Sequence, residues 1–263
     1  MSELPFTKLD YQVEGRVAYL TLNSPQNLNA FDEQMDQEVI DALKLCQADD
    51  SVRVVVLRGA GKAFSAGGDI GAMYAAVKRG GADFSGEVHK IAGVSMAIKQ
   101  LTKPVIAAVH GAVAGAAFNI SLACDFCMAA ENASFMQAFV NIGLIPDAGG
   151  LFLLSRAVGV NKAMELAMTG RPVSAQEAKE LGFVSQVVSQ DALEVATAKL
   201  AGRLAAGPAV SFAEMKRVMW EAQFKDMERY VTEEVKGQLH CGEVPDFQEG
   251  ICAFVEKRKP HYQ

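Results

Sequence analysis

The sequence predicts an α/β fold, because short apolar strands alternate with small-residue loops and helical patterns over most of the chain. Val52–Leu57 and Val105–Val109 are continuous apolar runs of the kind that parallel sheets bury on both faces. Each run is followed by a loop rich in glycine and alanine and then by a helical pattern. From Asp191 onward the pattern is helical throughout. These observations predict a β/α core over residues 1–190 and a helical region over residues 191–263, within one continuous domain.

The individual elements follow from local patterns along the chain. Thr7–Val13 and Arg16–Leu22 alternate apolar and polar residues around a Glu-Gly pair, which is typical of a β-hairpin. Asp32 is the expected N-cap of a helix that ends near Ser51. Met73–Gly86 is expected to form a mobile, partly helical cover. Further helices are predicted over 88–101, 119–123, 151–158, 162–169, 175–181, 191–206, 209–222, 226–240 and 247–257, and further strands over 124–129, 134–137 and 183–188.

Composition and charge narrow the class of protein. The 263 residues carry a net charge of −6, which disfavours nucleic acid or an anionic membrane as the main partner. No apolar run reaches the roughly 18 residues of a membrane span, and the N-terminus lacks the pattern of a signal peptide. Five cysteines are an odd number, so a reducing cytoplasm is expected. Cys124 and Cys127 fall in a predicted strand and would point to opposite faces, so no metal site is expected.

Gly59–Gly71 follows the first buried strand and contains five glycines. A loop of this composition is shaped by the needs of the backbone, because glycine permits tight turns and close approach. It is a weak match to a dinucleotide fingerprint, since Phe64 stands where a third small residue is needed. It also lacks the Gly-Lys-Ser/Thr of a phosphate-binding loop.

Phe139–Gly150 holds a single carboxylate, Asp147, at the end of an apolar run. Pro146 stiffens the backbone before it, and two glycines follow it. Burial in apolar surroundings disfavours the charged form and raises the pKa of a carboxyl group, as is typical of a general acid or base. The alternative interpretation is that Asp147 only caps the helix that begins near Gly149.

Several motifs occur in an order that resembles the crotonase (enoyl-CoA hydratase/isomerase) superfamily, and the match covers nearly the whole chain. The motifs are Ala63–Ile70, Lys103–Gly111, Gly143–Gly150, Leu166–Gly170 and Ala253–Arg258. The resemblance implies a spiral of ββα units whose C-terminal helical region forms trimers or dimers of trimers. It also implies a bent acyl-CoA thioester as substrate, with no cofactor beyond the coenzyme A of that substrate.

The resemblance further implies an oxyanion hole, in which two backbone N–H groups stabilise the enolate oxygen of the thioester. By motif position these are the N–H groups of Gly68 and Ala116. The adenine and pantetheine would lie against the 28–30 loop and Ala66. The residues assigned to substrate binding are Leu28, Ala30, Ala66, Asp69, Ile70, Asn119, Phe139 and Lys257, of which Lys257 could equally be an ordinary surface lysine.

The chain departs from the hydratase pattern at two positions. Family hydratases place two glutamates around the attacking water, whereas this chain has Asn119 and Phe139 there. Neither side chain can take a proton from water. Asp147 stands where hydratases have glycine, and it matches the acid of family members that move double bonds, including phenylacetate-pathway isomerases. A dehalogenase would need a histidine where this chain has Ala92.

Three functions remain open, and the sequence favours them in order. The first is an enoyl-CoA isomerase in which Asp147 moves a proton during a Δ3-to-Δ2 double-bond shift. The second is an enoyl-CoA hydratase with unusual acid and base residues. The third is a catalytically inactive protein that binds CoA esters, which the presence of Asp147 disfavours.

Overall fold

The computed structural model describes residues 6–79 and 85–263. Its main sheet has six strands in the order β1-β2-β3-β4-β6-β9. β1 and β2 form the antiparallel hairpin, and the other neighbouring strands pair in parallel. The strands of this sheet are β1 (Leu9–Glu14), β2 (Val17–Leu22), β3 (Val54–Gly59), β4 (Val105–Val109), β6 (Phe126–Ala130) and β9 (Gln186–Val188).

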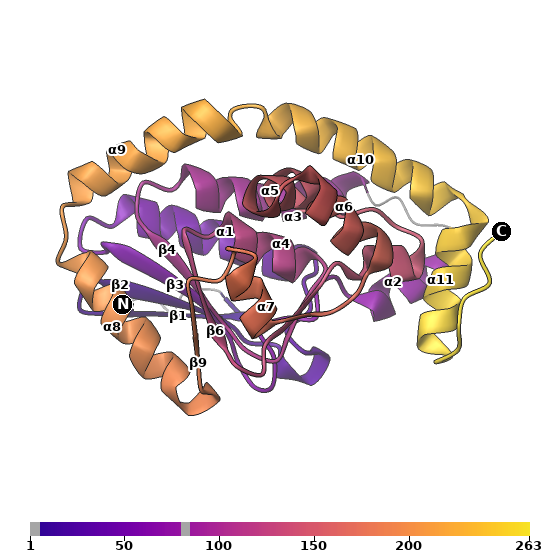
Figure 1. The fold of residues 1–263 in the computed structure, drawn as a ribbon, viewed down its shortest axis with the longest axis horizontal. Helices are drawn as coiled ribbons and strands as arrows, with labels where there is room; N and C mark the ends of the chain where they lie inside the picture. The colour runs from indigo at the N-terminus through magenta and orange to yellow at the C-terminus, as the bar shows by residue number, and fades with distance from the viewer. Residues whose placement is uncertain (1–5, 80–84) are drawn as a thin grey trace.

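Helices cover both faces of the main sheet (Figure 1). Alternate residues of β3 point to opposite sides, so Val55 and Leu57 enter the larger core while Val54 and Val56 enter a smaller one. The larger core contains α1 (Glu33–Ala48), α3 (Ser85–Gln100) and α4 (Ala116–Ala123). The smaller core is closed by α8 (Leu193–Ala205). This burial on both faces explains why the strands are continuously apolar.

A second sheet has three short strands, each of which lies shortly before a helical segment in the sequence. It consists of β5 (Ala112–Ala114), β7 (Ser134–Met136) and β8 (Val173–Ser174). Isolated bridges connect Ser65 with Val113 and Phe31 with Gly68, so the glycine-rich loop after β3 is attached to this sheet and to the start of α1. The remaining helices of the core are α2 (Ile70–Lys78), α5 (Gly150–Val158), α6 (Val160–Thr169) and α7 (Ala175–Glu180), and short helical turns span Pro25–Asn27, Ala138–Ile142 and Gln190–Ala192.

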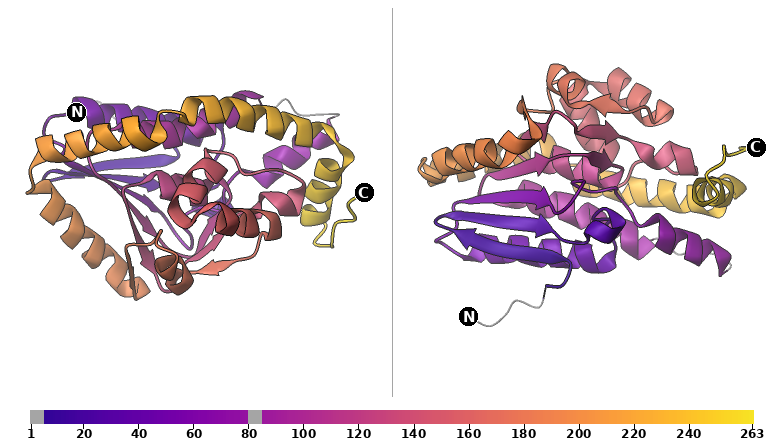
Figure 2. Two further views of the ribbon diagram at one scale, coloured as in Figure 1. Left: turned by 45° about the horizontal axis from the view of Figure 1, so that its top comes forward. Right: turned by 90° about the horizontal axis from the view of Figure 1, so that it is seen from below.

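The C-terminal helices form a long arm across the core (Figures 1 and 2). α9 (Ala209–Met219) continues through a π-helical turn at Trp220–Phe224 toward α10 (Met227–Glu243). α10 packs against α3, and α11 (Pro245–Val255) packs against α2. Within residues 6–79 and 85–263, no helix combines the length and apolar character that crossing a membrane requires.

The predicted α/β architecture with its helical C-terminal region is confirmed, and most element bounds agree within a few residues. Asp32 caps α1 as predicted, because its side chain accepts a hydrogen bond from Met35 N at 2.9 Å. Two local predictions were wrong. β5 lies within the glycine- and alanine-rich segment after β4 that was expected to be a loop, and Cys124 ends α4 and is not part of a strand. Residues 80–84 of the predicted mobile cover lie outside the described residues, and the division at residue 190 stays a prediction.

Candidate active site

Two loops bring a pair of backbone N–H groups to one pocket. Gly67 in the first loop has φ +89°, and a Cβ there would lie 2.6 Å from Ala114 O, so only glycine lets this loop pack so closely against β5. Gly68 follows directly, while Ala116 begins α4 after Gly115, which also has positive φ. In the described part of the chain, neither Gly68 N nor Ala116 N donates a hydrogen bond to another backbone or side-chain group. Both residues line the same pocket.

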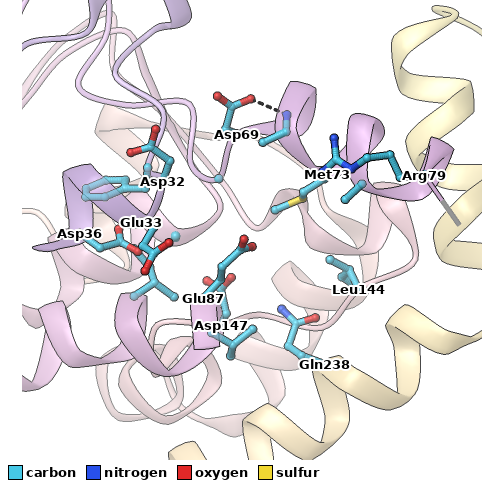
Figure 3. A pocket seen from close by; sticks show the side chains of 17 residues that line it. Asp32, Glu33, Asp36, Asp69, Met73, Arg79, Glu87, Leu144, Asp147 and Gln238 are labelled. Carbon is cyan, nitrogen blue, oxygen red and sulfur yellow. Dashed lines mark hydrogen bonds between the residues drawn. The ribbon is translucent and has the colours of Figure 1, made fainter. Parts of the chain in front are cut away.

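This pocket has a volume of about 180 Å³ and contains Asp147 as well as Gly68 and Ala116 (Figure 3). α1, α2, α3 and α10 contribute lining residues together with the loop before α5. Apolar side chains such as Met73, Val88 and Leu144 form part of the wall. The structure therefore brings three of the predicted site residues together, and Asp69 joins them at the start of α2.

Asp147 is half-buried, and its Oδ1 atom is buried without a hydrogen-bond partner among the residues that the structure describes. Burial is the main cause that raises the pKa of this carboxyl group to about 7. The helix-capping alternative does not hold, because Gly149 is the N-cap residue of α5 and no side chain caps that helix. An acid with a pKa near neutrality can exist both as base and as acid at working pH, which suits proton transfer.

The backbone of Asp147 is held by an amide chain from α4. Asn119 Nδ2 donates to Asp147 O at 2.8 Å, and Gln137 Nε2 donates to Asn119 Oδ1 at 2.7 Å. Gly150 N donates to the same carbonyl oxygen at 2.8 Å. Asn119 is fully buried and its polar atoms are occupied by the protein, so in this structure it positions the loop and does not line the pocket.

α10 binds the same loop through two further hydrogen bonds. Glu234 Oε1 accepts from Gly149 N at 3.1 Å, and Gln238 Nε2 donates to Ile145 O at 2.8 Å. Burial and then the charge of Asp147 raise the pKa of Glu234 to about 8. The carboxylate of Asp147 is therefore presented by a loop that is bound on both sides.

The other predicted substrate-binding residues lie outside this pocket. Phe139 is buried in the core, with its ring near Gly115. Leu28 is partly exposed, and its carbonyl oxygen accepts from Ala66 N at 3.0 Å, which places these two predicted residues side by side. Ala30 is buried and lies two residues after Leu28 in the sequence. Ile70 is the first residue of α2, and Lys257 is exposed just after the end of α11. Their roles in binding stay predictions.

Sequence reasoning missed Asp36, which lines the pocket from α1. Asp36 lies in the helix predicted after Asp32, three residues before Val39 and seven before Leu43, and both of these apolar residues are buried on α1. The position of an acid on an apolar helix face was the sequence pattern that could have indicated this residue. Gln238 of α10 was also missed, and no local pattern marks it.

The pocket is strongly acidic. Six of its described lining residues carry carboxyl groups, whereas Arg79 is the one cation among them. The acidic residues are Asp32, Glu33, Asp36, Asp69, Glu87 and Asp147. Despite this, no group of three or more potential ligands among the described residues is arranged to hold a metal ion.

Comparison with known proteins gives a consistent family. A family model described as "Enoyl-CoA hydratase/isomerase" matches residues 12–263. A trans-2-decenoyl-[acyl-carrier-protein] isomerase from Streptococcus mutans is 39% identical over 260 residues, covering 98% of this chain and 99% of that protein. A 1,2-epoxyphenylacetyl-CoA isomerase from Escherichia coli is 36% identical over 251 residues, covering 95% and 96%.

Relatives named as hydratases are almost as similar. A probable enoyl-CoA hydratase from Rhodobacter capsulatus is 35% identical over 259 residues, covering 98% of this chain and 99% of that protein. The crystal structure of an enoyl-CoA hydratase from Mycobacterium avium subsp. paratuberculosis matches with a TM-score of 0.89 at 35% identity, covering 98% of this chain and all of that one. The resemblance drawn from the motifs is confirmed, and this chain belongs to the enoyl-CoA hydratase/isomerase family.

Proposed function

We propose that this protein is an enoyl-thioester isomerase that moves a double bond between the Δ3 and Δ2 positions. The observation that carries the proposal is the placement of Asp147 in one pocket with Gly68 and Ala116. Within the described ranges, its buried carboxyl oxygen and the N–H groups of Gly68 and Ala116 have no hydrogen-bond partner. The two hydratase positions support it as well. The side chain of Asn119 donates a hydrogen bond to the backbone of the Asp147 loop, and Phe139 is apolar and buried.

In the proposed reaction the thioester oxygen lies against Gly68 N and Ala116 N. Asp147 removes a proton from C2, and the two N–H groups stabilise the resulting dienolate by roughly 3–4 kcal/mol each in a dry site. A proton is then returned at C4, in the simplest course by the same carboxyl group. The reaction needs no cofactor, because only a proton and a double bond change place.

The carrier of the acyl group is proposed to be coenzyme A, as the description of the family model suggests. The S. mutans relative is named for an acyl-carrier-protein substrate, so that carrier belongs in the same assay. A cytoplasmic location is supported by five unpaired cysteines. Assembly into trimers is supported by apolar side chains exposed on α9, namely Val210, Met215, Val218 and Met219.

The test is the substitution Asp147→Asn, assayed with a 3-enoyl-CoA through the absorbance gained on conjugation. We expect kcat to fall by about 100-fold or more, since the amide cannot take a proton, while binding of the CoA ester stays close to that of the wild type. Asp50→Asn, on the surface after α1, is the matched control and should retain wild-type kcat. Unchanged turnover in Asp147→Asn contradicts the proposal.

Hydration is the second candidate function, and the presence of another acid, Asp36, in the pocket is the observation that favours it. Crotonyl-CoA separates the two reactions, because hydration removes the enoyl absorbance whereas isomerisation of a 3-enoyl-CoA creates it. A protein that binds both thioesters and converts neither would instead be an inactive CoA-ester-binding protein.

A further inference from the structure

Asp36 is a second acid that lines the pocket, and one of its carboxyl oxygens, Oδ1, has no hydrogen-bond partner within residues 6–79 and 85–263. It belongs to α1 and is 3% exposed. Glu38, the other buried acid of α1, provides a contrast. It accepts hydrogen bonds from Thr7 N and Lys8 N, whereas Asp36 Oδ1 accepts none from the described part of the chain.

The groups around Asp36 favour its neutral form. Asp32 from its own helix, Glu87 from α3 and Asp147 from the opposite loop all add negative charge. Lys90 of α3 is the nearby cation, but its Nζ is bound to Glu33 at 2.6 Å. Burial and then the charge of Asp147 raise the pKa of Asp36 to about 8. The negative charge of Asp147 therefore favours the protonated form of Asp36.

The two carboxyl groups enter the pocket from different elements, Asp36 from α1 and Asp147 from the loop before α5 (Figure 3). A pair of carboxyl groups with different protonation states in one pocket can act as base and acid on the same substrate. Each has one carboxyl oxygen without a hydrogen-bond partner in the described part of the chain, and the pocket that they line also contains Gly68 and Ala116.

We propose that Asp36 is the proton donor of the isomerisation, so that Asp147 takes the proton from C2 and Asp36 gives its own proton to C4. The inference rests on the proposed function and makes it more specific. When the C2–H bond breaks, its proton forms an O–H bond on Asp147 and its electron pair enters the dienolate. When C4 takes the proton, the O–H bond of Asp36 breaks and the C2=C3 double bond forms. Release of the proton from Asp147 to solvent and uptake of a solvent proton by Asp36 restore the starting state.

This sequence differs from a single-carboxyl shuttle in the origin of the C4 hydrogen. The proton on Asp36 exchanges with solvent before each turnover, whereas a proton shuttled by Asp147 alone comes from C2 of the substrate. The experiment is conversion of a 3-enoyl-CoA in D₂O, with deuterium at C4 of the product measured by NMR or mass spectrometry. It compares the wild type, Asp36→Asn and Asp41→Asn. Asp41 is the matched control because it lies on the same helix but pairs with Lys44 away from the pocket.

We expect about one deuterium at C4 in the wild type and in Asp41→Asn. In Asp36→Asn, kcat should fall by about 100-fold or more, and the remaining product should contain less deuterium at C4, because the proton must return from Asp147. The pH profile of kcat/KM should also change. The wild type should lose activity above about pH 8, where Asp36 ionises, and Asp36→Asn should lack this alkaline decline.

Each other outcome counts against the inference. Absence of deuterium at C4 in the wild type contradicts it, as does an Asp36→Asn variant that keeps wild-type kcat and labelling. A variant that loses thermal stability but keeps the kinetic and labelling pattern shows that Asp36 is only structural. If the wild type converts no 3-enoyl thioester, the proposed function fails first and this inference fails with it.

Discussion

Gly150 lacks a side chain, and this leaves room for the hydrogen bond that positions the Asp147 loop. A Cβ at this position would lie 2.3 Å from Asn119 Nδ2 and 2.8 Å from Pro146 Cβ. Asn119 would have to move, and its hydrogen bond to Asp147 O would be lost or distorted. The two glycines after Asp147 are therefore explained by close packing around the loop as well as by the positive φ of Gly149.

The substitution Gly150→Ala should lower the free energy of unfolding by about 1–3 kcal/mol and reduce kcat, because overpacking displaces the amide that holds the Asp147 loop. Denaturant unfolding and the isomerase assay measure the two effects. Gly202→Ala is the control, since Gly202 lies inside α8 with no atom near the added Cβ. That variant should be more stable by about 0.5–1 kcal/mol and keep its activity. Equal behaviour of the two variants would contradict the role given to Gly150.

At the residue scale the sequence predicted Asp147, Gly68 and Ala116 as neighbours, and the structure places them in one pocket. They could be found because each belongs to a contiguous motif. Asp36 could not be found in this way, because its importance depends on burial and on the charge of a residue 111 positions later. The position of Asp36 on an apolar helix face indicates burial, but it does not identify the pocket that the side chain enters.

Among the elements, α10 has a larger role at the site than its pattern indicates. The sequence predicted it only as part of a helical region. In the structure, Glu234 and Gln238 lie one turn apart and bind the backbone on both sides of Asp147, at Gly149 N and Ile145 O. These contacts join residues 85 and 93 positions apart in sequence, so no local periodicity could reveal them.

This arrangement predicts that the acceptor oxygen of Glu234, more than its charge, supports the site. Glu234→Gln should keep kcat within about threefold, because the amide oxygen can still accept from Gly149 N. Glu234→Leu should lower stability by about 1–3 kcal/mol, since it leaves that N–H buried without an acceptor, and it should lower kcat more than it changes KM. Glu233→Leu, one residue away in an exposed pair with Lys236, is the control. Equal kcat in the Gln and Leu variants would contradict the role.

The elements that the sequence predicted well are those marked by a local sequence pattern. α1 has its cap at Asp32 and an apolar stripe, and β4 is continuously apolar. α4 begins three residues earlier than predicted, because Gly115 starts it with positive φ and no side-chain cap. β5 was missed for a different reason. It is a three-residue strand in a small-residue loop, and it depends on pairing with β7 and with Ser65, which lie far from it in the sequence.

In the whole molecule, three acids with a buried carboxyl oxygen come from distant parts of the chain and converge where the core meets the C-terminal arm. They are Asp36, Asp147 and Glu234, and the pKa of each is raised mainly by burial. The fold could be predicted because its motifs extend over nearly the entire chain. The convergence of these acids could not, since it depends on how α1, the α5 loop and α10 pack together.

These acids predict that stability decreases between mildly acidic and mildly alkaline pH. Each has a higher pKa in the folded protein than in the unfolded chain, so the folded state binds more protons in this range. Their unfavourable contribution is absent below about pH 4 and grows as pH rises through about 7 to 8, where the folded-state carboxyl groups must ionise while buried. Surface acids such as Glu249, whose pKa is lowered to about 2 by Arg258, change their contribution only at more acidic pH.

The free energy of unfolding should therefore be lower at pH 8.5 than at pH 5.5, two values chosen to lie on either side of about 7 to 8. Asp36→Asn should make this difference smaller by roughly 1–3 kcal/mol, because it removes one of the groups that must ionise. Denaturant unfolding at a fixed protein concentration measures both quantities. Asp41→Asn removes an exposed carboxylate from the same helix and should leave the difference unchanged. If Asp36→Asn and Asp41→Asn show the same pH dependence as the wild type, Asp36 is already ionised in the folded protein, and it could not hold the proton that the proposed donor role requires.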